Sequence, residues 1–277
     1  MKLLVCLEGS ESAANAVELA LTIAPGLGAE LFGVAIIDEP DIIAGEPTSI
    51  GGASFKRERD AALLDDAQMH AQDWLDRFAL RCRAAGIAAQ TEALSGDPGA
   101  LIVDQMQRHD LTLLGRDANF RFETQNRDRH TRDRILRRAG KPMLVVPPGP
   151  LASGASVMIA FDGSPAATRA LRSFAASGLG RGRPVRVTTV QDDGAIAFEI
   201  AVRGCELLAR EHGIRAEPDN VVSPSSTVAA LLERREQLAA GVIVLGGYVP
   251  SPLARLVWGS VTHGIIEHAP VPVFLHY

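Results

Sequence analysis

Residues 157–164 read Val-Met-Ile-Ala-Phe-Asp-Gly-Ser, a short apolar run that ends in an acidic residue, a glycine and a serine. Residues 3–10, Leu-Leu-Val-Cys-Leu-Glu-Gly-Ser, have the same character. An alanine-rich segment follows each run, which predicts a buried strand and then a helix capped by Ser10 or Ser164. The sequence therefore predicts a chain built from two related halves.

The alternation of strands and helices continues through both halves. Further strands are predicted at 30–37, 111–115 and 142–147 in the first half, and at 184–190, 242–246 and 270–275 in the second. Strands that alternate with helices form a parallel sheet with helices on both faces. The sequence thus predicts an α/β fold of two tandem Rossmann-like domains, residues 1–148 and 154–277, each a five-stranded doubly wound parallel sheet flanked by helices.

An insertion is expected in the first half. The offset between the halves falls from 154 residues, Gly9 to Gly163, to 131 residues, Gly115 to Gly246. The extra residues lie near 39–59, where glycines and prolines occur without a sustained period. This composition predicts a loop or lid that projects from the first domain.

The amino-acid composition favours a globular protein and argues against nucleic acid or a membrane as a partner. The 277 residues are 47% hydrophobic and 22% charged with a net charge of −5, which is typical of a globular protein with a sizeable core and gives no general attraction to nucleic acid or to an anionic membrane. No apolar run approaches the roughly 18 residues of a membrane span. We therefore expect a cytoplasmic location, with neither nucleic acid nor membrane as a partner.

The second half carries the candidate binding site. The apolar run 242–245 ends at Gly246-Gly247, and after a loop the residues Gly259-Ser260-Val261-Thr262 open a helix. A strand, a glycine loop and a helix start present backbone N–H groups and the positive helix end to phosphate. The site is not a Walker A loop, because that motif has lysine directly before the serine or threonine, and Trp258 and Gly259 precede Ser260 here.

The same stretch resembles the nucleotide loop of the universal stress protein family, in which a glycine, two residues, a second glycine, nine residues and Gly-Ser or Gly-Thr surround the phosphates of ATP. Gly246 and Gly259-Ser260 match this pattern, whereas Val249 stands at the second glycine and Pro250 follows it. The resemblance implies that ATP or another adenine nucleotide binds the second domain only. The candidate binding residues are Asp162, Val190, Leu245, Gly246, Gly247, Val249, Gly259, Ser260, Val261 and Thr262.

The resemblance also implies that the two domains pack as a pseudo-dimer through their last strands. The first domain departs further from the family pattern, with Glu8 in the place of Asp162 and with Arg129 and His130 in the places of Gly259 and Ser260. We therefore expect its pocket to hold no nucleotide. Its arginine-rich segment 116–138 has two interpretations, a solvated helix with ion pairs along one face or a site for an anion or a partner.

The sequence shows no catalytic constellation and no metal site. His263 and His268 are five residues apart, which does not place two imidazoles on one helix face. The favoured function is a stress-response module that binds adenine nucleotide weakly and acts through an unidentified protein partner, with a homodimer also open. The alternatives are a slow ATPase that uses the second pocket and a scaffold without a small ligand.

Overall fold

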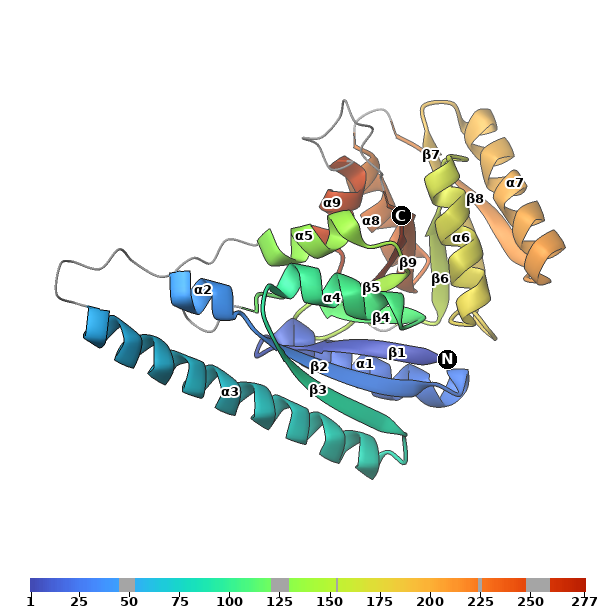
Figure 1. Ribbon diagram of the computed structural model, residues 1–277. Helices are drawn as coiled ribbons and strands as arrows, with labels where there is room; N and C mark the ends of the chain where they lie inside the picture. The colour runs from blue at the N-terminus through green and yellow to red at the C-terminus, as the bar shows by residue number, and fades with distance from the viewer. Residues whose placement is uncertain (45–52, 121–129, 153, 224–225, 248–259) are drawn as a thin grey trace. The chain divides into compact units, whose positions relative to one another are not determined.

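The structure is a computed structural model that describes residues 1–44, 53–120, 130–152, 154–223, 226–247 and 260–277 (Figure 1). The chain divides into two compact units, Met1–Arg138 and Ala139–Tyr277. Each unit is an α/β structure, and each is described by itself below.

The first unit contains a parallel sheet with the strand order β3-β2-β1-β4. Its elements are β1 (Lys2–Leu7), α1 (Glu11–Leu27), β2 (Glu30–Ile37), α2 (Glu39–Ala44), α3 (Ala53–Ala84), β3 (Ala89–Ser95), α4 (Pro98–Gln107), β4 (Leu111–Gly115) and α5 (His130–Arg138). Helix α1 packs on β1 and β4, and α3 packs on β2 and β3. The central strands β1 and β4 are buried along nearly their whole length, as strands covered on both faces must be.

Local sequence explains how α1 begins and ends. The Ser10 hydroxyl accepts a hydrogen bond from the Ala13 N–H at 3.1 Å, and Gly28 closes the helix in a left-handed conformation with φ of 56°. Small side chains, among them Ala16 and Ala20, are fully buried and let the helix lie close to the sheet. The serine cap predicted from the sequence is thus confirmed for α1.

The second unit follows the same alternation. Its elements are β5 (Met143–Val146), β6 (Ser156–Ala160), α6 (Pro165–Ser177), β7 (Val185–Gln191), α7 (Gly194–His212), β8 (Ala216–Val222), α8 (Thr227–Gln237), β9 (Ala240–Gly246), α9 (Ser260–His268) and β10 (Val273–His276). The strand order is β5-β10-β9-β6-β7-β8, and the five strands of the second half are parallel. Ser164 caps α6 as predicted, with its hydroxyl 3.1 Å from the Ala167 N–H.

The last strand of the first half belongs to the second unit. β5 pairs with β10 in antiparallel orientation, with Val145 opposite Val273 and Met143 opposite Leu275. The pairing of the last strands that the family resemblance implied is therefore present. Each half of the chain supplies five strands, as predicted, and the last strand of the first half lies within the second compact unit. The domain boundary near residues 148–154 stays a prediction.

The inserted segment is more helical than its sequence predicted. Residues 39–44 form α2, and α3 begins at Ala53, whereas the loop was expected to reach about residue 59. Residues 54–59, Ser-Phe-Lys-Arg-Glu-Arg, contain neither glycine nor proline and continue the helical segment that follows. The prediction of a loop or lid was wrong for these parts, and residues 45–52 lie outside the described part of the chain.

Candidate functional site

A cavity of about 150 Å³ lies at the carboxyl ends of three strands of the second unit. It is lined by Ala160, Phe161, Asp162, Ser164, Ala167, Thr188, Val190, Thr227, Leu231, Leu245, Gly246, Val261 and Thr262. These residues come from β6, β7 and β9, from the turn after β6, and from the N-terminal parts of α6, α8 and α9.

The topology places this cavity where a ligand site is expected. β6 lies between β7 and β9, so the chain leaves β6 toward one edge of the sheet and later returns to its other side. At such a reversal the loops after neighbouring strands diverge and leave a crevice beyond the carboxyl ends. The cavity in the second unit is that crevice.

Six of the ten candidate binding residues line the cavity, namely Asp162, Val190, Leu245, Gly246, Val261 and Thr262. Gly247 lies elsewhere, since a Cβ on it would be 2.3 Å from the ring of Tyr277. Ser260 is exposed at the start of α9 and is not part of the lining. Val249 and Gly259 lie outside the described residues.

Gly246 has a packing role at the end of β9. A Cβ on this residue would lie 2.4 Å from the backbone nitrogen of Ala167, so only glycine lets the strand end meet the start of α6. In the first unit a Cβ on Gly115 would lie 2.6 Å from the Ser12 hydroxyl and 2.9 Å from the Ala13 nitrogen. The glycine at this position is therefore required by strand and helix packing in both units, whether or not a ligand is bound.

Hydrogen bonds within the chain hold the polar groups around the cavity. The Asp162 carboxylate is exposed and accepts the Ser164 N–H at 2.9 Å, and the Thr262 hydroxyl lies 3.4 Å from the Gly246 carbonyl oxygen. Thr188 donates its hydroxyl to Asp219 at 2.9 Å, and Asp219 is in turn paired with Arg234. Asp162 thus stands at the cavity with lone pairs available to a ligand, while Thr188 is oriented by its own partner.

Several lining residues carry no signal in the sequence that predicts their place at the cavity. Phe161, Ala167, Thr227 and Leu231 were not proposed, and Ser164 was assigned only as a helix cap. Thr227 and Leu231 are one helical turn apart on α8 and face the cavity together. In the sequence, Ser226 and the apolar residues that follow it indicate where α8 begins. They do not indicate which face of the helix lies against the crevice.

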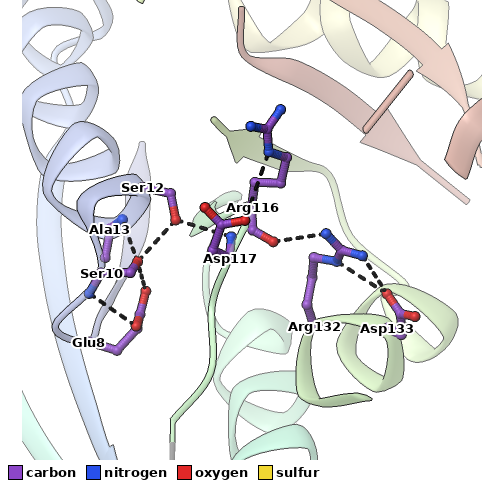
Figure 2. Close-up of polar contacts among 8 residues, drawn as sticks. All are labelled: Glu8, Ser10, Ser12, Ala13, Arg116, Asp117, Arg132 and Asp133. Atoms are coloured by element: carbon purple, nitrogen blue, oxygen red, sulfur yellow. Dashed lines mark hydrogen bonds and ion pairs between the residues drawn. The ribbon is translucent and has the colours of Figure 1, made fainter. Parts of the chain in front are cut away.

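The corresponding edge of the first unit is organised differently, as Figure 2 shows. Glu8 is buried, and its carboxylate accepts the Ser10 N–H at 3.2 Å, the Ser10 hydroxyl and the backbone N–H of Asn119. Burial raises the pKa of Glu8 to about 7 despite these hydrogen bonds, and the nearby Asp117 carboxylate adds to the rise. The chain's own groups therefore occupy the carboxyl end of β1.

The segment after β4 is bound to the start of α1. The Asp117 N–H donates to the Ser12 hydroxyl oxygen at 3.1 Å, and Ser12 also bonds Ser10 at 3.0 Å (Figure 2). Ala118 and Phe120 are each only 2% exposed. These contacts draw residues 117–120 over the edge of the sheet at the end of β1.

The arginine-rich segment contains a buried arginine. Arg132 is 2% exposed, donates to the Arg116 carbonyl oxygen at 2.9 Å and pairs with Asp133 at 3.0 Å (Figure 2). Arg134 contacts both carboxylate oxygens of Asp97 at 2.6 Å. A uniformly solvated helix with ion pairs along one face is therefore wrong for these residues. The residues 121–129 lie outside the described part, as does Arg129, and nothing is shown of the side chain of His130.

The described residues were also compared with the requirements of a metal site and of a membrane-spanning helix. No group of three or more His, Cys, Asp or Glu side chains is arranged to hold a metal ion within the described residues. The helices that the structure describes include none with the length and apolar character needed to cross a membrane.

The fold and the cavity define a tandem of two Rossmann-like α/β units with a crevice at the strand ends of the second. The model of the universal stress protein family matches residues 1–147 and 155–275. The chain therefore belongs to the universal stress protein family and contains two copies of its domain.

Individual relatives agree with this assignment. A curated universal stress protein of Synechocystis is 27% identical over 168 residues, which are 59% of this chain and 56% of that protein, so the match spans little more than half of the relative. A universal stress protein structure from Archaeoglobus fulgidus has a TM-score of 0.75 at 21% identity and covers 99% of this chain and 97% of its own. A putative universal stress protein from Pseudomonas aeruginosa has a TM-score of 0.58 at 16% identity, with coverage of 99% and 92%.

Proposed function

We propose that this protein is a stress-response module that binds adenine nucleotide weakly in its second unit and acts through contacts with a protein partner. The observation that carries the proposal is the cavity where Asp162, Val190, Gly246 and Val261 meet. These are positions at which the family pattern places the adenosine and the start of the phosphate loop. The weak affinity follows from Val249 and Pro250, which replace the second glycine of that loop and remove a backbone N–H.

The proposal assigns the nucleotide to the second unit alone. In the first unit Glu8 takes the place of Asp162, and its carboxylate is already bound by Ser10 and Asn119. A ligand at this edge would have to displace those hydrogen bonds and expose a buried carboxyl group, and displacing each bond without replacing it costs on the order of 1 kcal/mol. We expect no more than one nucleotide per chain.

Calorimetric titration of the full chain with adenine nucleotides tests this proposal. The expected result is weak binding with a stoichiometry of at most one, lost when Leu231→Trp fills the cavity and kept when Leu80→Trp adds the same ring on the exposed part of α3. Two equivalent sites would contradict the assignment to one unit. If no adenine compound binds, the alternative of a scaffold without a small ligand replaces the proposal.

A measurement of turnover separates the proposal from the alternative of a slow ATPase. Purified chain is incubated with ATP and magnesium, and released phosphate is followed over hours. We expect no release above that of the Leu231→Trp variant. Phosphate release that the variant abolishes would establish the slow ATPase.

A further inference from the structure

The outer edge of the first unit's sheet is open to solvent. This edge is β3, which stands at one end of the strand order and has β2 as its neighbour (Figure 1). Six of its seven residues are exposed. An edge strand presents a row of backbone N–H and C=O groups that can pair with another chain. We propose that this edge binds the same edge of a second copy of this chain in antiparallel orientation, whether or not nucleotide is bound.

The hydrogen bonds at the two ends of β3 show the direction of its backbone groups. The Leu31 N–H donates to the Ala88 carbonyl oxygen at 3.0 Å. The Gly96 N–H donates to the Ile37 carbonyl oxygen, also at 3.0 Å. Because backbone groups alternate in direction along a strand, the even-numbered residues of β3 are directed at β2. The residues that direct their N–H and C=O groups away from the sheet are therefore Ala89, Thr91, Ala93 and Ser95.

The β3 strand lacks the features that protect a sheet edge. Its sequence, Ala-Gln-Thr-Glu-Ala-Leu-Ser, contains no proline, lysine or arginine. Its seven residues pair with β2 in one continuous register, without a bulge. Exposed edges of natural sheets are usually protected by such residues, by bulges or by a covering segment. The edge of β3 is therefore suited to pairing.

The outer edge of the second unit, β8, is protected. The Ser223 N–H donates to the Gln191 carbonyl oxygen at 3.3 Å, so the even-numbered residues of β8 are directed outward. Pro218 is one of these residues, and it has no N–H to offer to an added strand. The two edges thus differ in the group that strand pairing requires, which favours β3 as the binding edge.

A second copy matches the β3 edge in a two-fold register centred on Thr91. In this register Thr91 lies opposite Thr91 of the second copy and Ala89 lies opposite Ala93, so these outward residues exchange both backbone hydrogen bonds. Gln90 then lies opposite Glu92 of the second copy, where its amide donates to the carboxylate. A register centred on Glu92 would place two carboxylates opposite each other, which is unfavourable. The edge is therefore complementary to itself.

Sedimentation velocity of the full chain without nucleotide, at concentrations from about 1 to 500 μM, tests the proposal. We expect a monomer–dimer equilibrium with a Kd of about 10–100 μM, because a single pair of strands forms a small interface. Thr91→Pro removes the central outward N–H and should weaken the dimer at least about tenfold. Thr91→Val keeps this N–H and should stay within about threefold of the parent chain.

Two results would overturn the proposal. A chain that stays monomeric at all these concentrations would leave the edge to an extended segment of a different protein. A dimer that Thr91→Pro leaves as tight as the parent would show that the copies pair elsewhere. Thermal unfolding of Thr91→Pro checks that the variant is folded, which we expect because the Thr91 N–H is not directed at β2.

A charge exchange at Thr91 tests the register and stays informative if Thr91→Pro does not fold. Thr91→Lys and Thr91→Glu each place like charges opposite one another, and the neighbours Ala89 and Ala93 on the same face carry no charge. We expect each variant alone to dimerise less tightly than the parent chain. An equal mixture of the two should form a dimer at least about threefold tighter than either variant alone. Equal association of the mixture and the single variants would contradict the register.

Discussion

The segments after β1 and β6 both contain an acidic residue, a glycine and a serine, but the acidic residue is exposed in one and buried in the other. In the second unit Asp162 is exposed beside a cavity, whereas in the first unit Glu8 is buried and bound by Ser10 and Asn119. Both carboxylates accept the N–H of the serine two residues further on, and Glu8 in addition accepts the Ser10 hydroxyl and the backbone N–H of Asn119 in the segment after β4. A single conservative replacement thus accompanies the change from a site that is open to a ligand to one that is closed by the chain.

The largest effect is expected from Glu8→Gln. The folded pKa of Glu8 is about 7, above the ordinary value of 4.5, so the folded state binds an extra proton between these pH values. Stability therefore falls as the pH rises from about 4.5 to 7 and is constant above this window, a loss of up to about 3 kcal/mol. Glu8→Gln should remove this slope and raise the free energy of unfolding at pH 8, measured by urea denaturation from pH 4 to 8.

Asp162→Asn is the matched control for this comparison, because the same change of charge is made at an exposed residue. We expect it to leave the dependence of stability on pH nearly as in the parent chain. If the two variants changed the slope equally, the burial of Glu8 would not be its source.

The next largest effect on stability is expected from replacing the glycine that ends β4 or the glycine that ends β9. Gly246→Ala places a Cβ against the Ala167 nitrogen, and Gly115→Ala places one against Ser12 and Ala13. Both changes overpack a strand end on a helix start and should lower the free energy of unfolding by roughly 2 kcal/mol. Gly26 is exposed in the last turn of α1, so Gly26→Ala meets nothing within 4 Å and should stabilise the chain slightly. Thermal unfolding of the three variants would refute this reasoning if Gly26→Ala were the most harmful.

A smaller effect is expected in the nucleotide loop. Val249→Gly combined with Pro250→Ala restores the glycine of the family pattern and one backbone N–H. Because a hydrogen bond to a charged phosphate contributes about 1.5 kcal/mol or more, ATP should bind at least about tenfold tighter while adenosine changes little. Titration calorimetry measures both affinities.

Ser260→Ala in this double variant should reverse part of the gain if phosphate lies at the start of α9. An unchanged ATP affinity in the double variant would mean that Val249 and Pro250 do not limit the loop.

The smallest effect is expected from removing the serine caps of α1 and α6. Ser164→Ala removes the bond to the Ala167 N–H and should cost about 1 kcal/mol. Ser10→Ala removes the matching cap and also a partner of the Glu8 carboxylate, so its cost should be larger at pH 8 than at pH 5. Denaturation at both pH values checks this, and equal costs for Ser10→Ala would contradict the coupling to Glu8.

The sequence predicted the repeated α/β pattern because each strand and cap is a local signal. Ser10, Ser164 and the paired glycines Gly115 and Gly246 could be found by comparing the two halves. The pairing of β5 within the second unit could not, because which sheet a short apolar strand joins depends on distant partners. The family resemblance supplied that expectation.

The residues of the candidate site also fall into two groups, those that the sequence could predict and those that it could not. Asp162 and Val190 follow strands, so the general rule for parallel sheets places them at the crevice. Thr227 and Leu231 depend on how α8 rotates against the sheet, and the burial of Glu8 depends on the path of residues 117–120. Neither is encoded by a local pattern.

The antiparallel pairing of β5 with β10 has a consequence for dissecting the chain. A fragment that starts after the linker would keep β10 but lose Met143–Val146, and so would present a bare apolar strand edge to solvent. Such an edge is a template for another copy of itself. The β5 segment covers this edge of β10, and we expect a synthetic peptide of its sequence to return the fragment to a monomer.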